Sequence, residues 1–179
     1  VTNPHHQRLA QIDNSFLVYE DAQPNCAMHV ASTQIHEAAP LRRDDGSIDI
    51  ERIEEYVLSR LDRIPRYRQK LAFTPIEHHP VWVDDPSFNI RYHVRHARIP
   101  HPGTERQLKR MVGRIFSHRL DREKPLWELW VIEGLEGDRI AILSKVHHCM
   151  VDGVSGSELL SELLTSEPLE KPEPPGRWH

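Results

Sequence analysis

Residues 139–153, RIAILSKVHHCMVDG, join a strongly apolar run to a polar loop. The run IAIL is apolar on both faces of an extended chain, which is typical of a central strand in a covered sheet. Two adjacent histidines, His147 and His148, follow it, and Asp152 and Gly153 come shortly after. Loops that leave a rigid sheet are where proteins commonly carry reactive side chains. We therefore expect a buried strand that ends in a candidate reactive loop.

Outward from this stretch, hydrophobic periodicity divides the chain into strands and helices. Period-two alternation and short apolar runs predict strands at residues 27–36, 81–83, 88–94, 126–133 and 139–148. Helical spacing of apolar residues predicts helices at 47–64 and 104–120 and a third from Ser155, the last two with capping-box spacing. This order predicts an α/β sandwich in which helices pack on a mixed β-sheet.

The length of 179 residues is typical of one domain. Prolines accumulate after Glu167, which favours a linker or tail over a core element. We assign residues 1–166 to one domain and residues 167–179 to a Pro-rich linker. Because the chain lacks an initiating Met, we expect it to be trimmed or cut from something longer.

Charge and composition exclude several classes of protein. The net charge of −4 argues against a nucleic-acid partner, which prefers a basic face. Cys26 and Cys149 have no metal-like spacing, and so few cysteines indicate a reducing, cytoplasmic compartment. No apolar stretch approaches the roughly 20 residues of a spanning helix. The 13 histidines include adjacent pairs, whose side chains point to opposite faces of a strand, so we expect no metal.

The histidine loop supports two interpretations from its residues alone. A histidine at a strand end can act as a general base near neutral pH, while Asp152 braces the loop and Gly153 permits a positive φ. A hydrogen-bonded structural histidine pair fits the spacing equally well. Cys149 beside His148 offers a nucleophile, but neighbouring side chains on a strand face apart. The run from Gly153 to Ser157 lacks the last glycine of a nucleophile elbow.

A family resemblance separates these interpretations. The run from His147 to Gly153 resembles the H-H-x-x-x-D-G signature of the CoA-dependent acyltransferase superfamily. A second block resembles the P-L-W-E motif of bacterial wax ester synthase/diacylglycerol acyltransferases, namely Pro125, Leu126, Trp127 and Glu128. Similar segments include Leu120-Asp121-Arg122, Asp13, Phe16 and Met28-His29-Val30. The resemblance implies a CoA-dependent acyltransferase-like sandwich.

The resemblance also implies a reaction and roles for residues. His148 would be the general base for direct transfer of a long-chain acyl group from acyl-CoA to diacylglycerol or a fatty alcohol, with no cofactor. His147 and the P-L-W-E block would support the loop, and an ion pair to Arg68 would hold Asp152. A condensation-type domain acting on carrier-bound acyl groups and a non-enzymatic module are the alternatives.

Family members are longer, so the resemblance implies a similar C-terminal half of the same protein as a partner. The lipid-like acceptors imply peripheral association with a membrane or a lipid body.

Overall fold

A computed structural model describes residues 7–23 and 26–151. Its main sheet has the strand order β2-β7-β6-β5. The strands are β2 (His29–Glu37), β5 (Val94–Arg98), β6 (Trp127–Leu135) and β7 (Arg139–His147). β7 pairs antiparallel with β2 and β6, whereas β5 pairs parallel with β6 across a helical connection. The predicted mixed sheet is therefore confirmed.

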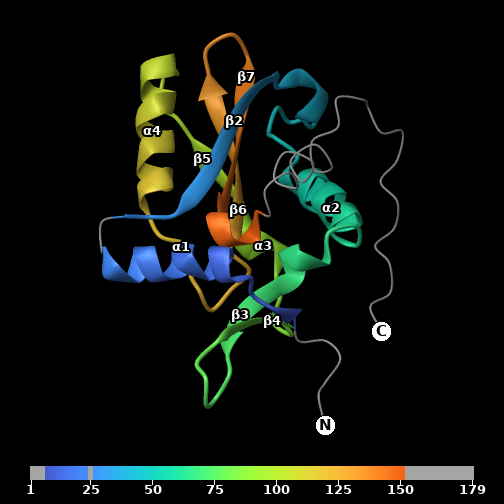
Figure 1. Cartoon of the computed structure of the whole chain (residues 1–179). Coiled ribbons are helices and arrows are strands. Elements are labelled where there is room, and N and C mark those ends of the chain that lie inside the picture. The colour runs from blue at the N-terminus through green and yellow to red at the C-terminus, as the bar shows by residue number, and fades with distance from the viewer. Residues whose placement is uncertain (1–6, 24–25, 152–179) are drawn as a thin grey trace.

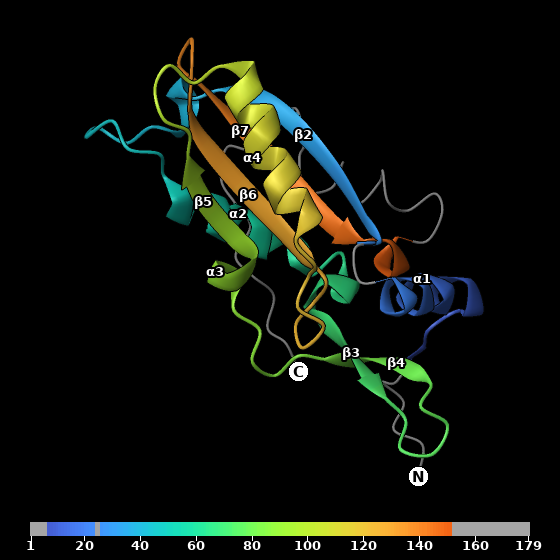
Figure 2. The same ribbon diagram turned by 90° about the vertical axis from the view of Figure 1, so that its left-hand side faces the viewer.

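The central position of β7 explains its apolar sequence. It has a partner strand on each edge, and every residue after Arg139 is buried. Two helices cover the two faces of the sheet, α2 (Ile50–Leu61) and α4 (Glu105–Ser117) (Figures 1 and 2). The α2 face buries Trp127, and the α4 face buries Lys145.

Both helices begin at a residue that the sequence favours. The Asp49 side chain accepts the Arg52 N–H at 3.1 Å, and Thr104 forms the predicted capping box with Gln107. α2 is shorter than the predicted 47–64, because the chain tightens into the 3-10 turn η2 (Pro65–Arg68) soon after Leu61.

A second, antiparallel sheet has the strand order β1-β4-β3. Its strands are β1 (Gln7–Arg8), β3 (Gln69–Phe73) and β4 (Pro80–Asp84). Helix α1 (Gln11–Ala22) lies across the end of the main sheet, next to the 3-10 turn η3 (His148–Met150) (Figure 1). A further 3-10 turn, η1 (Ala39–Leu41), follows β2. Sequence periodicity missed α1, because its buried residues are only Leu17 and the acidic Glu20.

The strand predicted at 88–94 is wrong. Residues Ile90–His93 form a short helix, α3, and β5 begins only at Val94. The Asn89 side chain accepts the Arg91 N–H at 3.0 Å and starts the helical turn. His93, at the end of this helix, is buried.

The predicted third helix from Ser155, the domain boundary after residue 166 and the linker at 167–179 all lie outside the described residues. Within residues 7–23 and 26–151, no helix combines the length and apolar character that a membrane span requires.

Candidate functional site

His148 sits in η3, immediately after the central strand. Its backbone N–H donates to the Met28 carbonyl oxygen at 2.8 Å. Its ring stacks on Phe16 of α1, with ring centroids 3.9 Å apart and an interplanar angle of 21°. The Nδ1 atom of His148 is buried and has no hydrogen-bond partner among the described residues. The imidazole is thus fixed by stacking, while this ring nitrogen stays uncommitted within the described part of the chain.

His147 has the opposite environment, although it is the adjacent residue. It is 1% exposed, and its Nδ1 accepts the Cys149 backbone N–H at 3.1 Å. Because Nδ1 is an acceptor, the neutral ring carries its proton on Nε2, which lies 3.5 Å from Glu20 Oε2. Burial lowers the pKa of His147 to about 4, although nearby Glu20 acts to raise it. His147 is therefore a neutral, hydrogen-bonded core residue at neutral pH.

Four polar residues gather behind the histidine turn and form what we call the Glu20 cluster: Glu20, His29, Arg122 and His147. Arg122 Nη2 donates to Glu20 Oε2 at 2.7 Å, and the Met28 N–H donates to Glu20 Oε1 at 3.3 Å. Burial acts to raise the pKa of Glu20, but these hydrogen bonds outweigh it and hold the pKa below its usual value. Glu20 is therefore a buried carboxylate that stays ionised.

His29 and Lys145 connect the cluster to the C-terminal end of α4. The His29 Nδ1 lies 3.4 Å from the Phe116 carbonyl oxygen, and burial lowers the pKa of His29. Lys145 Nζ donates to the Ile115 carbonyl oxygen at 2.9 Å and also to that of His118. These donors satisfy carbonyl groups that a helix end leaves without intrahelical partners. They fix α4 against the strand that carries the histidines.

The P-L-W-E block lies beside the histidine strand, because β6 and β7 are antiparallel neighbours in the main sheet. Trp127 pairs in register with Val146, and the Leu126 carbonyl oxygen accepts the His147 N–H at 2.9 Å. Trp127 is buried, and its Nε1 donates to the Tyr67 carbonyl oxygen at 2.8 Å. Pro125 and Leu126 are buried too. The block therefore supports the strand end from the side.

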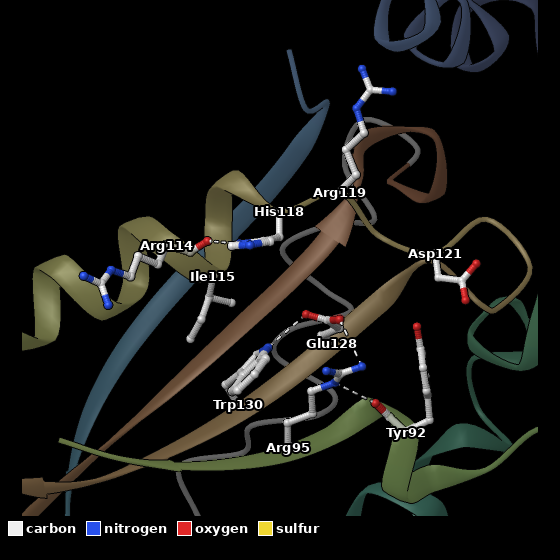
Figure 3. A pocket seen from close by; sticks show the side chains of 9 residues that line it. All are labelled: Tyr92, Arg95, Arg114, Ile115, His118, Arg119, Asp121, Glu128 and Trp130. Atoms are coloured by element: carbon white, nitrogen blue, oxygen red, sulfur yellow. Dashed lines mark hydrogen bonds and ion pairs between the residues drawn. The ribbon is translucent and has the colours of Figure 1, made fainter. Parts of the chain in front are cut away.

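Glu128, the last residue of this block, lines a pocket on the α4 face of about 430 Å³ (Figure 3). Its carboxylate accepts from Trp130 Nε1 at 2.9 Å and lies 3.6 Å from Arg95 Nη2. Arg95 stacks over the rings of Tyr92 and Trp130. Neither motif histidine lines this pocket. Glu128 therefore belongs to a pocket that is separate from the histidine turn.

Asp152 and Gly153 lie outside the described residues, so their roles stay predictions. The same holds for the expected Asp152–Arg68 ion pair. The guanidinium carbon of Arg68 lies 5.2 Å from the Phe88 ring centroid, at the end of η2.

Cys149 follows the histidines but is 4% exposed. Burial raises the pKa of its thiol to about 12, so the nucleophilic thiolate is scarce at neutral pH. Within the described segments, no group of three or more His, Cys, Asp or Glu side chains is arranged to hold a metal ion.

Sequence reasoning missed Glu20 as part of the site. Acids are rarely fully buried unless they are paired, so a lone glutamate carries no burial signal of its own. His29 and Arg122 lay in segments that resemble the family, but their convergence on Glu20 is a property of the fold.

Comparisons with known proteins agree with this architecture. A family model described as the wax ester synthase/diacylglycerol acyltransferase catalytic domain matches residues 9–179. A Mycobacterium tuberculosis protein named a probable diacylglycerol O-acyltransferase is 40% identical over 150 residues, covering 83% of this chain and 52% of that protein. The chain spans between 23% and 52% of the length of the first curated relatives that it matches.

Solved structures show the same fold. The wax ester synthase/diacylglycerol acyltransferase from Marinobacter aquaeolei VT8 matches with a TM-score of 0.74 and 31% identity, covering 94% of this chain and 41% of that chain. A starter condensation domain of the rhizomide synthetase matches with a TM-score of 0.69 at 9% identity, covering 88% of this chain and 36% of that one, which shows a likeness of fold alone. With a family model that covers nearly its whole length, the chain belongs to the wax ester synthase/diacylglycerol acyltransferase catalytic-domain family.

Proposed function

We propose that this chain carries the catalytic histidine of an O-acyltransferase that moves a long-chain acyl group from acyl-CoA to diacylglycerol or a fatty alcohol. His148 accepts the proton of the acceptor hydroxyl, and the oxygen attacks the thioester carbonyl carbon. The C–S bond then breaks, and the departing CoA thiolate takes the proton from His148. The thioester is already activated, so the reaction needs no further cofactor.

The contrast between the two histidines is the observation that carries this proposal. His147 is buried, with Nδ1 committed to the Cys149 N–H and Nε2 directed at Glu20. His148 is only half-buried, and its Nδ1 has no hydrogen-bond partner in the described part of the chain. A general base needs a ring nitrogen that is not already engaged as an acceptor, so the geometry favours His148 over His147.

Direct transfer, with no covalent intermediate, fits the state of the neighbouring thiol. A Cys149 nucleophile would have to ionise, and burial raises its pKa to about 12. General-base catalysis by His148 contributes about 10²–10⁴-fold, and positioning and oxyanion donors must supply the rest.

Product analysis tests the proposal. The full-length protein is mixed with a long-chain acyl-CoA and, in separate reactions, a long-chain alcohol or diacylglycerol, and the lipids are separated by chromatography. We expect wax ester, triacylglycerol or both, and neither from His148→Ala. His36→Ala is the matched control, because His36 is an exposed histidine on β2. Absence of both products from the folded wild-type protein would refute the proposal.

A condensation-type reaction is the second candidate, favoured only by the likeness of fold to condensation domains. A parallel reaction with a carrier-bound acyl group and an amine acceptor distinguishes the two. Amide formation without ester formation would replace the first proposal with the second.

We propose peripheral membrane or lipid-body association for the same protein, because acceptors of this kind partition into lipid. A second, similar domain in the full-length protein would complete the substrate channel. Sodium carbonate washing of the membrane fraction tests the association, since a peripheral protein is released and an embedded one stays in the pellet.

A further inference from the structure

Nitrogen atoms from three separate segments of the chain lie within 3.5 Å of the Glu20 carboxylate. Arg122, on the segment before β6, donates to Oε2 at 2.7 Å. The Nε2 of His147, at the end of β7, lies 3.5 Å from the same oxygen, and the Met28 N–H, before β2, donates to Oε1 at 3.3 Å. Glu20 therefore brings α1 next to the start of β2, the end of β7 and the Arg122 segment.

These contacts lead directly to His148. Its backbone N–H donates to the carbonyl oxygen of Met28, the same residue whose N–H donates to Glu20. The Nδ1 of His147 accepts the N–H of Cys149, inside the turn that holds His148. The two residues on either side of His148 in the chain are therefore tied to one network.

α1 adds a third link. Phe16 and Glu20 are four residues apart, so they lie on the same face of the helix. Phe16 stacks on the His148 ring, and Glu20 anchors the same helix beneath η3. The helix position set by Glu20 thus determines where the stacking ring lies.

We infer that Glu20 is a positioning residue, which joins Arg122 to His147 and holds the turn and helix that orient the His148 imidazole. Its kinetic readout rests on the proposed function. Glutamine in its place has one oxygen only, so its NH₂ group must face a donor, and at least one of the three contacts is lost.

Glu20→Gln in the full-length protein is the principal test. We expect kcat to fall about 10- to 100-fold, because a displacement of about 1 Å in the reacting groups has effects of that size. Both proteins are assayed at a temperature where circular dichroism shows them fully folded. Asp21→Asn is the matched control: Asp21 also pairs with Arg122, at 2.9 Å, but its side chain is 63% exposed. We expect its kcat to stay within about twofold of wild type, because an exposed ion pair contributes little free energy and its loss should leave the buried contacts of Glu20 in place.

Histidine NMR supplies a readout that loss of stability alone would not move. The Nε2 nitrogen of His147 is buried 3.5 Å from Glu20 Oε2, so its proton should give an observable signal, assigned by its absence in His147→Asn, and Glu20→Gln should shift or remove this signal. An unchanged signal, or an unchanged kcat in folded Glu20→Gln, overturns the inference.

If Glu20→Gln does not fold, His147→Asn replaces it, because the asparagine oxygen still accepts the Cys149 N–H but nothing reaches Glu20. We expect a comparable loss of kcat, and full activity would overturn the inference. If the wild-type protein transfers no acyl group, the proposed function fails, while the NMR comparison still tests the role of Glu20.

Discussion

Two buried histidines occupy opposite faces of the same end of the main sheet, and their surroundings differ. On the α4 face, His147 belongs to the Glu20 cluster, which contains an ionised carboxylate and a guanidinium. On the α2 face, His93 is stacked between the rings of Phe88 and Trp127, with centroids 5.1 and 4.4 Å away. Its Nδ1 donates to the Trp127 carbonyl oxygen at 2.8 Å.

Burial lowers the pKa of both histidines to about 4, yet only one has a charged partner. The aromatic stack fixes ring planes and excludes water. The Glu20 cluster adds directional hydrogen bonds to the backbone of the turn that holds His148. The α2 face therefore packs His93 between aromatic rings, whereas the α4 face connects His147 to charged groups and to the backbone of the turn that holds His148.

The largest expected effect separates the motif from the aromatic stack. His148→Ala should reduce transfer by about 10²–10⁴-fold, the usual contribution of a general base. His93→Asn keeps a donor toward the Trp127 carbonyl oxygen and should retain most of the activity of folded protein. Initial rates with saturating acyl-CoA measure both. A similar loss of activity in both folded variants would show that the two faces do not differ in function.

Stability should also distinguish the two faces. Arg122→Met leaves the Glu20 carboxylate buried without its cation and should lower the free energy of unfolding by about 3 kcal/mol. Trp127→Phe removes one hydrogen bond to the Tyr67 carbonyl and should cost about 1–3 kcal/mol. Urea unfolding gives both values. A cost for Arg122→Met no greater than that of the exposed Asp21→Asn would show that the Arg122 contact is dispensable.

The stability of the folded protein is expected to depend on pH through His93 and His147. Each pKa is lower in the folded protein than its ordinary 6.5, so between pH 6.5 and about 4 only the unfolded chain gains a proton. Stability is therefore unaffected above this window and falls as the pH drops through it, by about 1.4 kcal/mol per pH unit for each histidine. His93→Asn should flatten the measured slope by one such contribution, and an unchanged slope would contradict a neutral, buried His93.

Much of the fold follows from local patterns in the sequence. The apolar run in β7 and the capping box at Thr104 are both local signals, and both features are present. The alternation at 88–94 led to a wrong prediction, because a two-residue period over so short a segment is weak evidence and the Asn89 side chain starts a helical turn there. There, tertiary packing of His93 against Trp127 outweighs the local pattern.

The site divides in the same way. The histidine pair and the P-L-W-E block are each a continuous run of residues, so a sequence motif identifies each of them. Glu20 lies more than a hundred residues from both Arg122 and His147 along the chain, and α1 has few apolar residues that face inward. Only the folded arrangement brings these groups within hydrogen-bonding distance.

The smallest expected effect concerns Cys149, which contributes to the Glu20 cluster through its backbone only. Its N–H donates to His147 Nδ1, while its thiol is buried and has a pKa raised by that burial to about 12. Cys149→Ala keeps the N–H and should leave kcat within about twofold of wild type, since no reacting group moves. Its stability cost should be modest, about 1 kcal/mol, because a small buried side chain is shortened by one atom.

A maleimide at neutral pH should modify the half-buried Cys26 before Cys149. Loss of activity in folded Cys149→Ala would instead assign the thiol a chemical role and reopen the covalent mechanism.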